Sequence, residues 1–91
     1  MTPMITTIPR VRQVDHVSGL TVRLWFTDGL TGEVDLGYLL DRGPIFQPLR
    51  QPGYFRTVRV DPILGTVVWP NGADVAPETL HEIVRGSHVA G

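Results

Sequence analysis

The sequence predicts a small α+β domain, in which a mainly antiparallel sheet of about five strands accompanies short helical turns in the middle and one C-terminal helix. Residues 20–26 and 30–36 alternate between apolar and polar positions, which is the period of half-buried strands. Asp28-Gly29 between them is a turn pair, so the two segments form a hairpin. Residues 77–86 instead carry apolar side chains at i, i+3 and i+4, which predicts a helix that packs by one face.

The length and composition fit one folded domain. The chain has 91 residues, enough for one hydrophobic core and too few for two. Hydrophobic residues make up 42% and charged residues 19%, and the mean hydropathy of +0.05 is that of an ordinary globular protein. We therefore expect a single domain over residues 1–91, with an ordered core over about residues 10–86 and flexible ends.

Charge and cysteine content exclude several classes of function. The eight basic and nine acidic residues give a net charge of −1, so the whole chain lacks the positive surplus that attracts nucleic acid or anionic membranes. The absence of cysteine removes disulfides, thiolate zinc sites and cysteine nucleophiles. Residues 1–9 lack a basic start and an apolar run, and no run of about 20 apolar residues occurs. We therefore expect no signal peptide, and a cytoplasmic protein that does not enter membranes.

The register of the hairpin follows from the parity of its apolar residues. A loop over residues 27–29 places Phe26 opposite Leu30 and keeps both apolar sets on one face. The same register sets Arg23 opposite Glu33, an opposite-charge pair on the other face. A shorter loop would mix the faces, because a slip by one residue inverts a strand. We therefore predict the longer loop, closed by a left-handed glycine.

The remaining segments predict shorter elements. A strand, two helical turns and two later strands are expected, in that order, over residues 11–15, 38–40, 44–49, 57–60 and 66–69. Pro77 opens the last helix, and Gly86 is predicted to end it. The apolar side chains expected to form the core are Val22, Leu24, Phe26, Val34, Leu36, Phe46, Leu49, Phe55, Val58, Val60, Leu80, Ile83 and Val84.

Several short motifs along the chain resemble one known family. They are Phe26-Thr27-Asp28-Gly29, Val34-Asp35-Leu36, Phe46-Gln47-Pro48-Leu49, Trp69-Pro70-Asn71-Gly72-Ala73-Asp74 and Pro77-Glu78-Thr79-Leu80. Together they resemble the domain-of-unknown-function family 2442, a mainly bacterial family, over about residues 10–85. The resemblance implies a compact α+β fold and no established activity.

Two further features of that family bear on function. Many members are encoded beside another small protein, an arrangement like that of toxin–antitoxin pairs, so the resemblance implies a partner of that kind. Some members carry an added helix-turn-helix domain. Because this sequence ends soon after its predicted last helix, we do not expect such a domain here.

The sequence contains no recognisable catalytic motif. Neither serine stands in a nucleophile motif, and the histidines do not predict a triad. Glu78 and His81 share a helix face, but a di-iron site needs that spacing twice, so we expect a solvated face. Asp35, Asp61 and Asp74 adjoin turns and are expected to cap the local backbone rather than bind a cation. We therefore predict a protein that is not an enzyme and has no cofactor or metal.

The outer face of the hairpin is the surface best suited to binding. Arg23 and Trp25 share this face, and Arg59 continues it if the later strands lie beside the hairpin. Trp69 and Asn71 belong to a turn that is either an exposed recognition loop or, as we favour, the end of a strand with a core tryptophan. All basic residues are arginine, which fits either biased codon use or a surface made for bidentate contacts.

This surface is either a solvated face of mixed charge without a binding role or a binding surface. Two classes of function are open in the second case. The favoured hypothesis is a small non-catalytic protein-interaction domain, which binds a protein partner or a second copy of itself through the outer face and an exposed strand edge. The alternative is a nucleic-acid-binding regulator, because an arginine–aromatic face can stack on single strands. Glu33 and Asp35 share the face and repel phosphate, so specific binding to duplex DNA is not expected.

Overall fold

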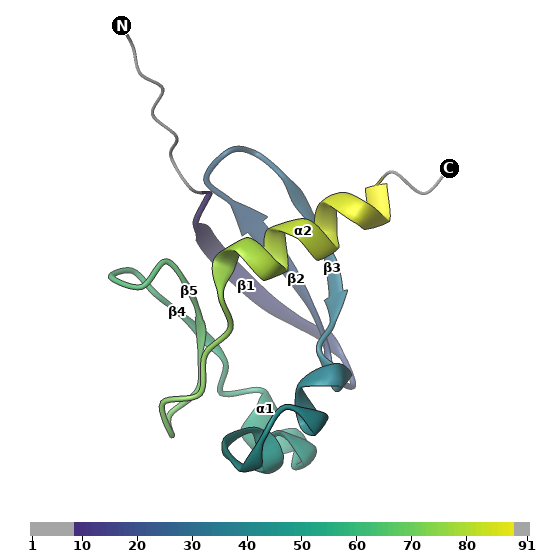
Figure 1. Cartoon of the computed structure of the whole chain (residues 1–91), viewed down its shortest axis with the longest axis vertical. Helices are drawn as coiled ribbons and strands as arrows, with labels where there is room; N and C mark the ends of the chain where they lie inside the picture. The colour runs from purple at the N-terminus through teal and green to yellow at the C-terminus, as the bar shows by residue number, and fades with distance from the viewer. Residues whose placement is uncertain (1–8, 89–91) are drawn as a thin grey trace, which may run out of the picture.

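The computed structural model describes residues 9–88 and has the predicted α+β fold (Figure 1). Its strands are β1 (Val11–Ser18), β2 (Thr21–Phe26), β3 (Thr31–Asp35), β4 (Arg59–Asp61) and β5 (Thr66–Val68). Its helical segments are the 3-10 turns η1 (Gly37–Asp41) and η2 (Pro44–Arg50), the single turn α1 (Pro52–Phe55) and the helix α2 (Pro77–His88). Most of the residues expected to form flexible ends, 1–8 and 89–91, lie outside the described residues, and residues 87 and 88 belong to α2.

The strands form two antiparallel sheets rather than one. The first has the order β1-β2-β3, and the second is the ribbon β4-β5. The ribbon lies beside β1 (Figure 1). It is joined to the start of that strand by a hydrogen bond of 2.9 Å from Val11 N to Gly65 O.

The β2–β3 hairpin has the predicted register. Val22 pairs with Val34, and Arg23 pairs with Glu33. The N–H of Phe26 donates to Leu30 O at 2.8 Å, which closes the loop over residues 27–29. The last loop residue is Gly29, whose φ of 93° lies in the left-handed region as predicted.

The helix α2 covers one face of the three-stranded sheet (Figure 1). Its residues Leu80 and Val84 are fully buried against that face. The helix continues past Gly86 to His88, so the predicted end was wrong by two residues. Gly86 does not have the positive φ of a glycine that terminates a helix, because the backbone there keeps its helical course. No helix among residues 9–88 has the length and apolar character needed to cross a membrane.

All the predicted core residues belong to one hydrophobic cluster, and four of them, Phe46, Val58, Val60 and Ile83, are partly rather than fully buried. The list of predicted core side chains omitted Val11, Leu39, Val67, Ala73 and Val75. It also omitted Trp69, although a core position was the favoured interpretation of that residue.

Strand β5 is buried on both faces and bonded on both edges. Its residues Thr66, Val67 and Val68 are all buried, so they do not alternate. One edge pairs with β4, and the other meets residues 73–75 through a bridge between Val68 and Asp74. The Thr66 hydroxyl donates to the Val75 carbonyl within the same contact. Both edges of this strand therefore have a neighbouring segment.

The first sheet ends at β1 and β3, and β1 is irregular. Its pairing with β2 shifts register between Val11 and Gln13, and again between His16 and Ser18. Such shifts are β-bulges, which bend and twist an edge strand.

Candidate interaction surface

The outer face of the three-stranded sheet, opposite α2, carries the predicted pair Arg23 and Trp25. Arg23 donates to the Glu33 carboxylate at 2.6 Å, and both side chains are nearly half exposed. Asp15, opposite Arg23, and Asp35 at the end of β3 are exposed. Trp25 is half-buried. The arginine is therefore neutralised within its own sheet, and this part of the face has more negative than positive charge.

The other three residues of the predicted surface do not join this face. Arg59 lies on β4, which pairs with β5 and not with the hairpin, so it does not continue the sheet that holds Arg23 and Trp25. Trp69 is 1% exposed, and its indole N–H donates to Phe55 O at 3.1 Å. Its inclusion in an exposed surface was wrong, and the favoured core interpretation is correct.

Asn71 is exposed, but its polar groups are used within the fold. Its side-chain amide donates to Ile45 O at 2.9 Å, and its side-chain oxygen accepts from the N–H of Ala73 at 3.0 Å. Its backbone N–H donates to the Tyr54 hydroxyl at 2.8 Å. Asn71 therefore holds the turn after β5 against η2 and α1.

Several titratable residues are held by structural contacts. Asp35 accepts a hydrogen bond from Gly37 N, and Asp61 accepts from the N–H groups of Ile63 and Leu64, so the capping expected of these two carboxylates is confirmed. His81 corrects the expectation of a solvated helix face, because its side chain is only 16% exposed. Within residues 9–88, no group of three or more histidines and carboxylates is placed to hold a metal ion.

His81 fastens α2 to the hairpin loop. Its Nε2 lies 2.8 Å from Asp28 Oδ2, and its ring meets Phe26 edge-on with centroids 5.0 Å apart. Asp28 Oδ1 also accepts from the N–H of Leu30 at 3.0 Å. The backbone N–H of Leu30 and the His81 ring hold the pKa of Asp28 below its ordinary value of 3.8.

Replacing Asp28 by asparagine is expected to lower the melting temperature at pH 7, and the difference between the two proteins is expected to shrink as pH is lowered from 7 to about 2. A carboxyl with a lower pKa in the folded chain stabilises the fold above its unfolded pKa, and this stabilisation is lost as pH falls through the folded pKa. Thermal unfolding of both proteins across this range measures the difference. Asp41→Asn, at another exposed aspartate, is the control, and a gap that stays constant at every pH would contradict the role of the Asp28 charge.

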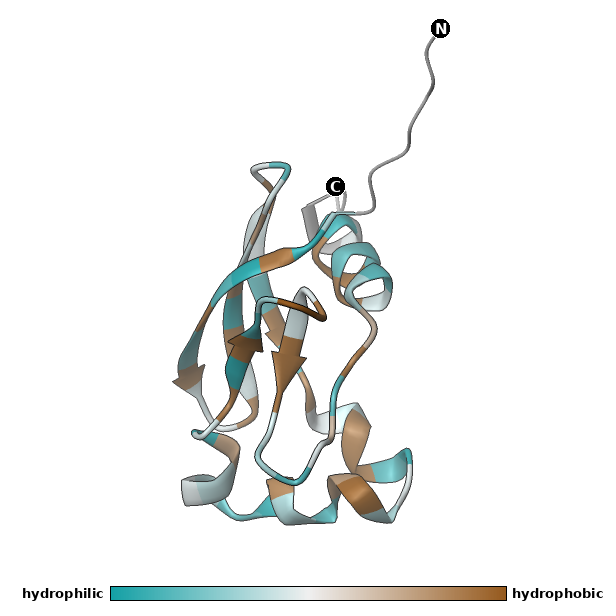
Figure 2. Ribbon diagram, turned by 90° about the vertical axis from the view of Figure 1, so that its left-hand side faces the viewer, coloured by the Kyte–Doolittle hydropathy of each residue, from teal (hydrophilic) through white to brown (hydrophobic). Residues whose placement is uncertain are grey.

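The turn between β4 and β5 presents two large apolar side chains to solvent. Ile63 is 84% exposed and Leu64 is 50% exposed. In Figure 2 this turn projects beyond the two strands and lies at the hydrophobic end of the colour scale. Among the described side chains, the other exposed large hydrophobic ones, Val17 and Ile45, are only 44% and 45% exposed.

The backbone of this turn is fixed from both sides. The Arg10 guanidinium donates to Pro62 O at 2.6 Å and to Ile63 O at 3.0 Å. Asp61 Oδ1 accepts from the N–H groups of Ile63 and Leu64 at 2.8 and 3.1 Å, and these bonds lower the pKa of Asp61. These hydrogen bonds therefore hold the turn although neither of its two apolar side chains is buried.

Gly65 is required at the end of this turn. Its φ of 69° lies in the left-handed region, and a Cβ there would stand 2.7 Å from Arg10 Cζ. A side chain would displace the guanidinium that holds the turn. The close approach of Arg10 and the conformation of Gly65 therefore depend on each other.

A comparison with protein families identifies the family of this chain. The model described as "Protein of unknown function (DUF2442)" matches residues 11–86. The chain belongs to this family. The match agrees with the resemblance drawn from the motifs and covers nearly all the described residues of the DUF2442 domain. No curated protein matches the sequence.

A solved structure shows the DUF2442 fold in a longer chain. The crystal structure of the "Putative DNA Binding Protein NE0471" from Nitrosomonas europaea matches with a TM-score of 0.75 at 21% sequence identity. The match covers 88% of this chain and 51% of that one, so this chain spans about half the length of that protein. At this identity the likeness establishes a shared fold.

Sequence reasoning missed the apolar turn of this DUF2442 chain, although a signal was present. Residues 61–65 join the two strands predicted over residues 57–60 and 66–69, and such connections lie on the surface. Ile63 and Leu64 occupy the middle of that turn, where polar residues and glycine are usual. Large apolar residues at such positions indicate side chains that the fold leaves exposed.

Proposed function

We propose that this chain is a small non-catalytic protein-interaction domain of the cytoplasm, with Ile63 and Leu64 as the anchor for its protein partner. The observation that carries the proposal is the exposure of these two side chains on a turn fixed by Arg10 and Asp61. Single exposed apolar residues are common on protein surfaces. An adjacent pair on an ordered turn is better suited to fill a pocket in another protein.

The order of the turn favours binding. A loop that is already fixed in its bound conformation loses little conformational entropy when the partner docks. Burying one isoleucine or leucine side chain contributes about 1.5–3 kcal/mol. The two side chains can therefore supply a substantial part of the affinity of a small interface.

The test compares variants of the turn with variants of the outer face. The partner to be used is the protein encoded beside this one, and light scattering after size exclusion tests for a second copy of the chain. Ile63→Ser is expected to weaken binding about tenfold to a hundredfold and to leave the melting temperature nearly unchanged. Val17→Ser is the matched control, because Val17 is 44% exposed on β1, away from the turn.

Three outcomes would contradict the proposed anchor. Ile63→Ser and Leu64→Ser could retain full binding to the partner. Val17→Ser could weaken binding as much as the turn variants do. Loss of binding in Arg23→Ala or Trp25→Ala alone would place the contact on the outer sheet face instead.

The alternative is a nucleic-acid-binding regulator, and the name of the Nitrosomonas europaea protein favours it. The charges oppose it, because the net charge is −1 and Asp15, Glu33 and Asp35 surround Arg23 on the outer face. Fluorescence anisotropy with labelled single-stranded and duplex DNA at low salt decides between the two. Tight binding that weakens steeply as salt is added would favour the regulator.

A further inference from the structure

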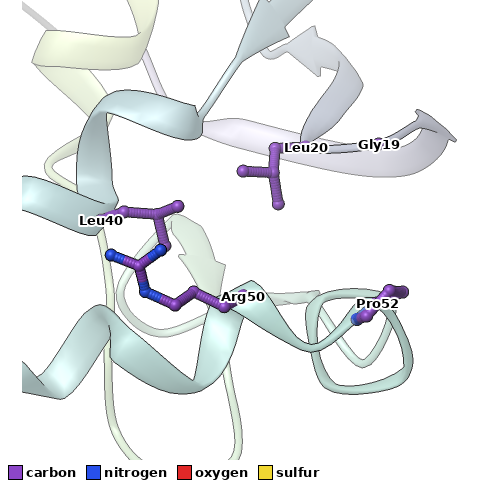
Figure 3. Close-up of a pocket in the computed structure, with 5 residues that line it drawn as sticks. All are labelled: Gly19, Leu20, Leu40, Arg50 and Pro52. Carbon is purple, nitrogen blue, oxygen red and sulfur yellow. The ribbon is translucent and has the colours of Figure 1, made fainter.

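A hollow of about 270 Å³ lies where the β1–β2 turn meets the helical segments. Its lining residues are Gly19, Leu20, Leu40, Arg50 and Pro52. Figure 3 shows Leu20 and Leu40 on opposite sides of the hollow, with the Arg50 guanidinium beside Leu40. This region is distinct from the apolar turn between β4 and β5, which projects from another side of the molecule (Figure 1).

The Arg50 side chain is oriented by a short chain of hydrogen bonds. Its Nε donates to Gln47 Oε1 at 2.8 Å, and Gln47 Nε2 donates to Leu40 O at 2.7 Å. This arrangement uses one nitrogen of the guanidinium. The terminal nitrogens of Arg50 have no hydrogen-bond partner among residues 9–88. The cation is thus positioned at the hollow with its paired donors open.

Three of the backbone carbonyls around the hollow already have hydrogen-bond partners. Gly19 O contacts His16 Nε2 at 2.9 Å, and Leu20 O accepts from Leu36 N at 2.8 Å. Leu40 O accepts from Gln47. A ligand therefore finds few open carbonyl groups to which it could donate, whereas the guanidinium still offers donors. A bidentate acceptor with negative charge fits these donors best.

We propose that this hollow binds the carboxylate of an apolar acid, with the carboxylate on Arg50 and the apolar part between Leu20, Leu40 and Pro52. A cavity of about 150 Å³ holds benzene, so the larger hollow has room for a branched or aromatic group with its carboxylate. Such a carboxylate belongs either to a free small acid or to the C-terminal residue of a peptide. Both sources present the same chemistry to the protein.

The test is a titration of the isotopically labelled protein, followed by its amide NMR signals. Phenylacetate is the probe, and phenylacetamide is its neutral counterpart of the same shape. We expect saturable shifts at the lining residues with phenylacetate, with a dissociation constant on the order of 1 mM, and much weaker shifts with the amide. A tripeptide that ends in phenylalanine, with a free or an amidated C-terminus, separates the two sources by their relative affinities.

Two substitutions make the test specific to the arginine. Arg50→Gln is expected to weaken phenylacetate binding about tenfold or more, because it removes a charged bidentate partner. Arg56→Gln is the matched control, since Arg56 is exposed and does not line the hollow. An unchanged amide spectrum before titration establishes that Arg50→Gln is folded.

The proposal is overturned by any of three results. Phenylacetate and phenylacetamide could bind equally well, which would mean that binding does not depend on the negative charge of the ligand. Arg50→Gln could bind like the unaltered protein, or Arg56→Gln could weaken binding as much as Arg50→Gln. Finally, phenylacetate and the free-carboxylate peptide could both fail to produce saturable shifts at the lining residues.

Discussion

Replacing Phe26 by alanine is expected to lower the free energy of unfolding by about 3–5 kcal/mol. Phe26 is 1% exposed, ends β2 and packs against the His81 ring of α2. Alanine at this position leaves a cavity between the sheet and the helix, which the surrounding backbone cannot fill completely. Small domains have total stabilities of about 5–15 kcal/mol, so the variant is expected to be partly unfolded at 37 °C.

Urea unfolding followed by far-ultraviolet circular dichroism measures this loss. The matched control is Ile63→Ala, which removes an apolar side chain that is 84% exposed in the folded protein. This control is expected to unfold within about 0.5 kcal/mol of the unaltered chain. Equal midpoints for Phe26→Ala and the unaltered protein would remove Phe26 from the core.

Replacing Trp69 by alanine is expected to be comparably destabilising, by about 3–5 kcal/mol. Its ring lies 5.8 Å from that of Phe55, and its indole N–H satisfies the Phe55 carbonyl. Trp69→Phe keeps most of the apolar contact and removes only the indole hydrogen bond, because the N–H of Val58 still donates to the Phe55 carbonyl at 3.1 Å. A smaller loss of about 0.5–1.5 kcal/mol is therefore expected.

The two Trp69 variants separate packing from hydrogen bonding. Ile45→Ala serves as their control, because the Ile45 side chain is 45% exposed and only its backbone carbonyl contacts Asn71. If Trp69→Phe were as stable as the unaltered protein, the indole hydrogen bond would contribute nothing measurable. If Trp69→Ala and Trp69→Phe were both as stable as the unaltered protein, Trp69 would not be a core residue.

The parts of the fold that sequence could predict are those with a strong local pattern. The hairpin register follows from the parity of the apolar residues, because a loop shorter by one residue would put the two apolar sets on opposite faces. The C-terminal helix follows from its apolar stripe. The predicted end of this helix was wrong because glycine often terminates helices, whereas the backbone at Gly86 stays helical.

The burial of β5 could not be predicted from alternation. Val67 and Val68 point to opposite faces of the strand, and both faces are covered in the fold. That outcome depends on residues 73–75, which return beside β5 after a turn. Similarly, the division into two sheets depends on which strands pair over long separations in sequence.

For the candidate sites too, the sequence predicts local contacts but not contacts between distant segments. The position of Arg23 opposite Glu33 followed from the register, and so did their ion pair. The hydrogen bonds that fix the apolar turn join Arg10 to carbonyls more than 50 residues away, and no local pattern indicates that contact. The placement of Arg50 beside Leu20 depends equally on contacts between distant segments.

The irregular pairing of β1 has a consequence for aggregation. An edge strand that offers a long, regular row of backbone groups can recruit further strands and grow into a fibril. In β1 the regular stretch between the two register shifts covers only residues 13–16, with the charged Asp15 inside it. Fibril-forming segments are usually about six or seven residues long and nearly uncharged. The bulges therefore leave this edge too short and too polar to act as a template, which helps the chain to stay dispersed at high concentration.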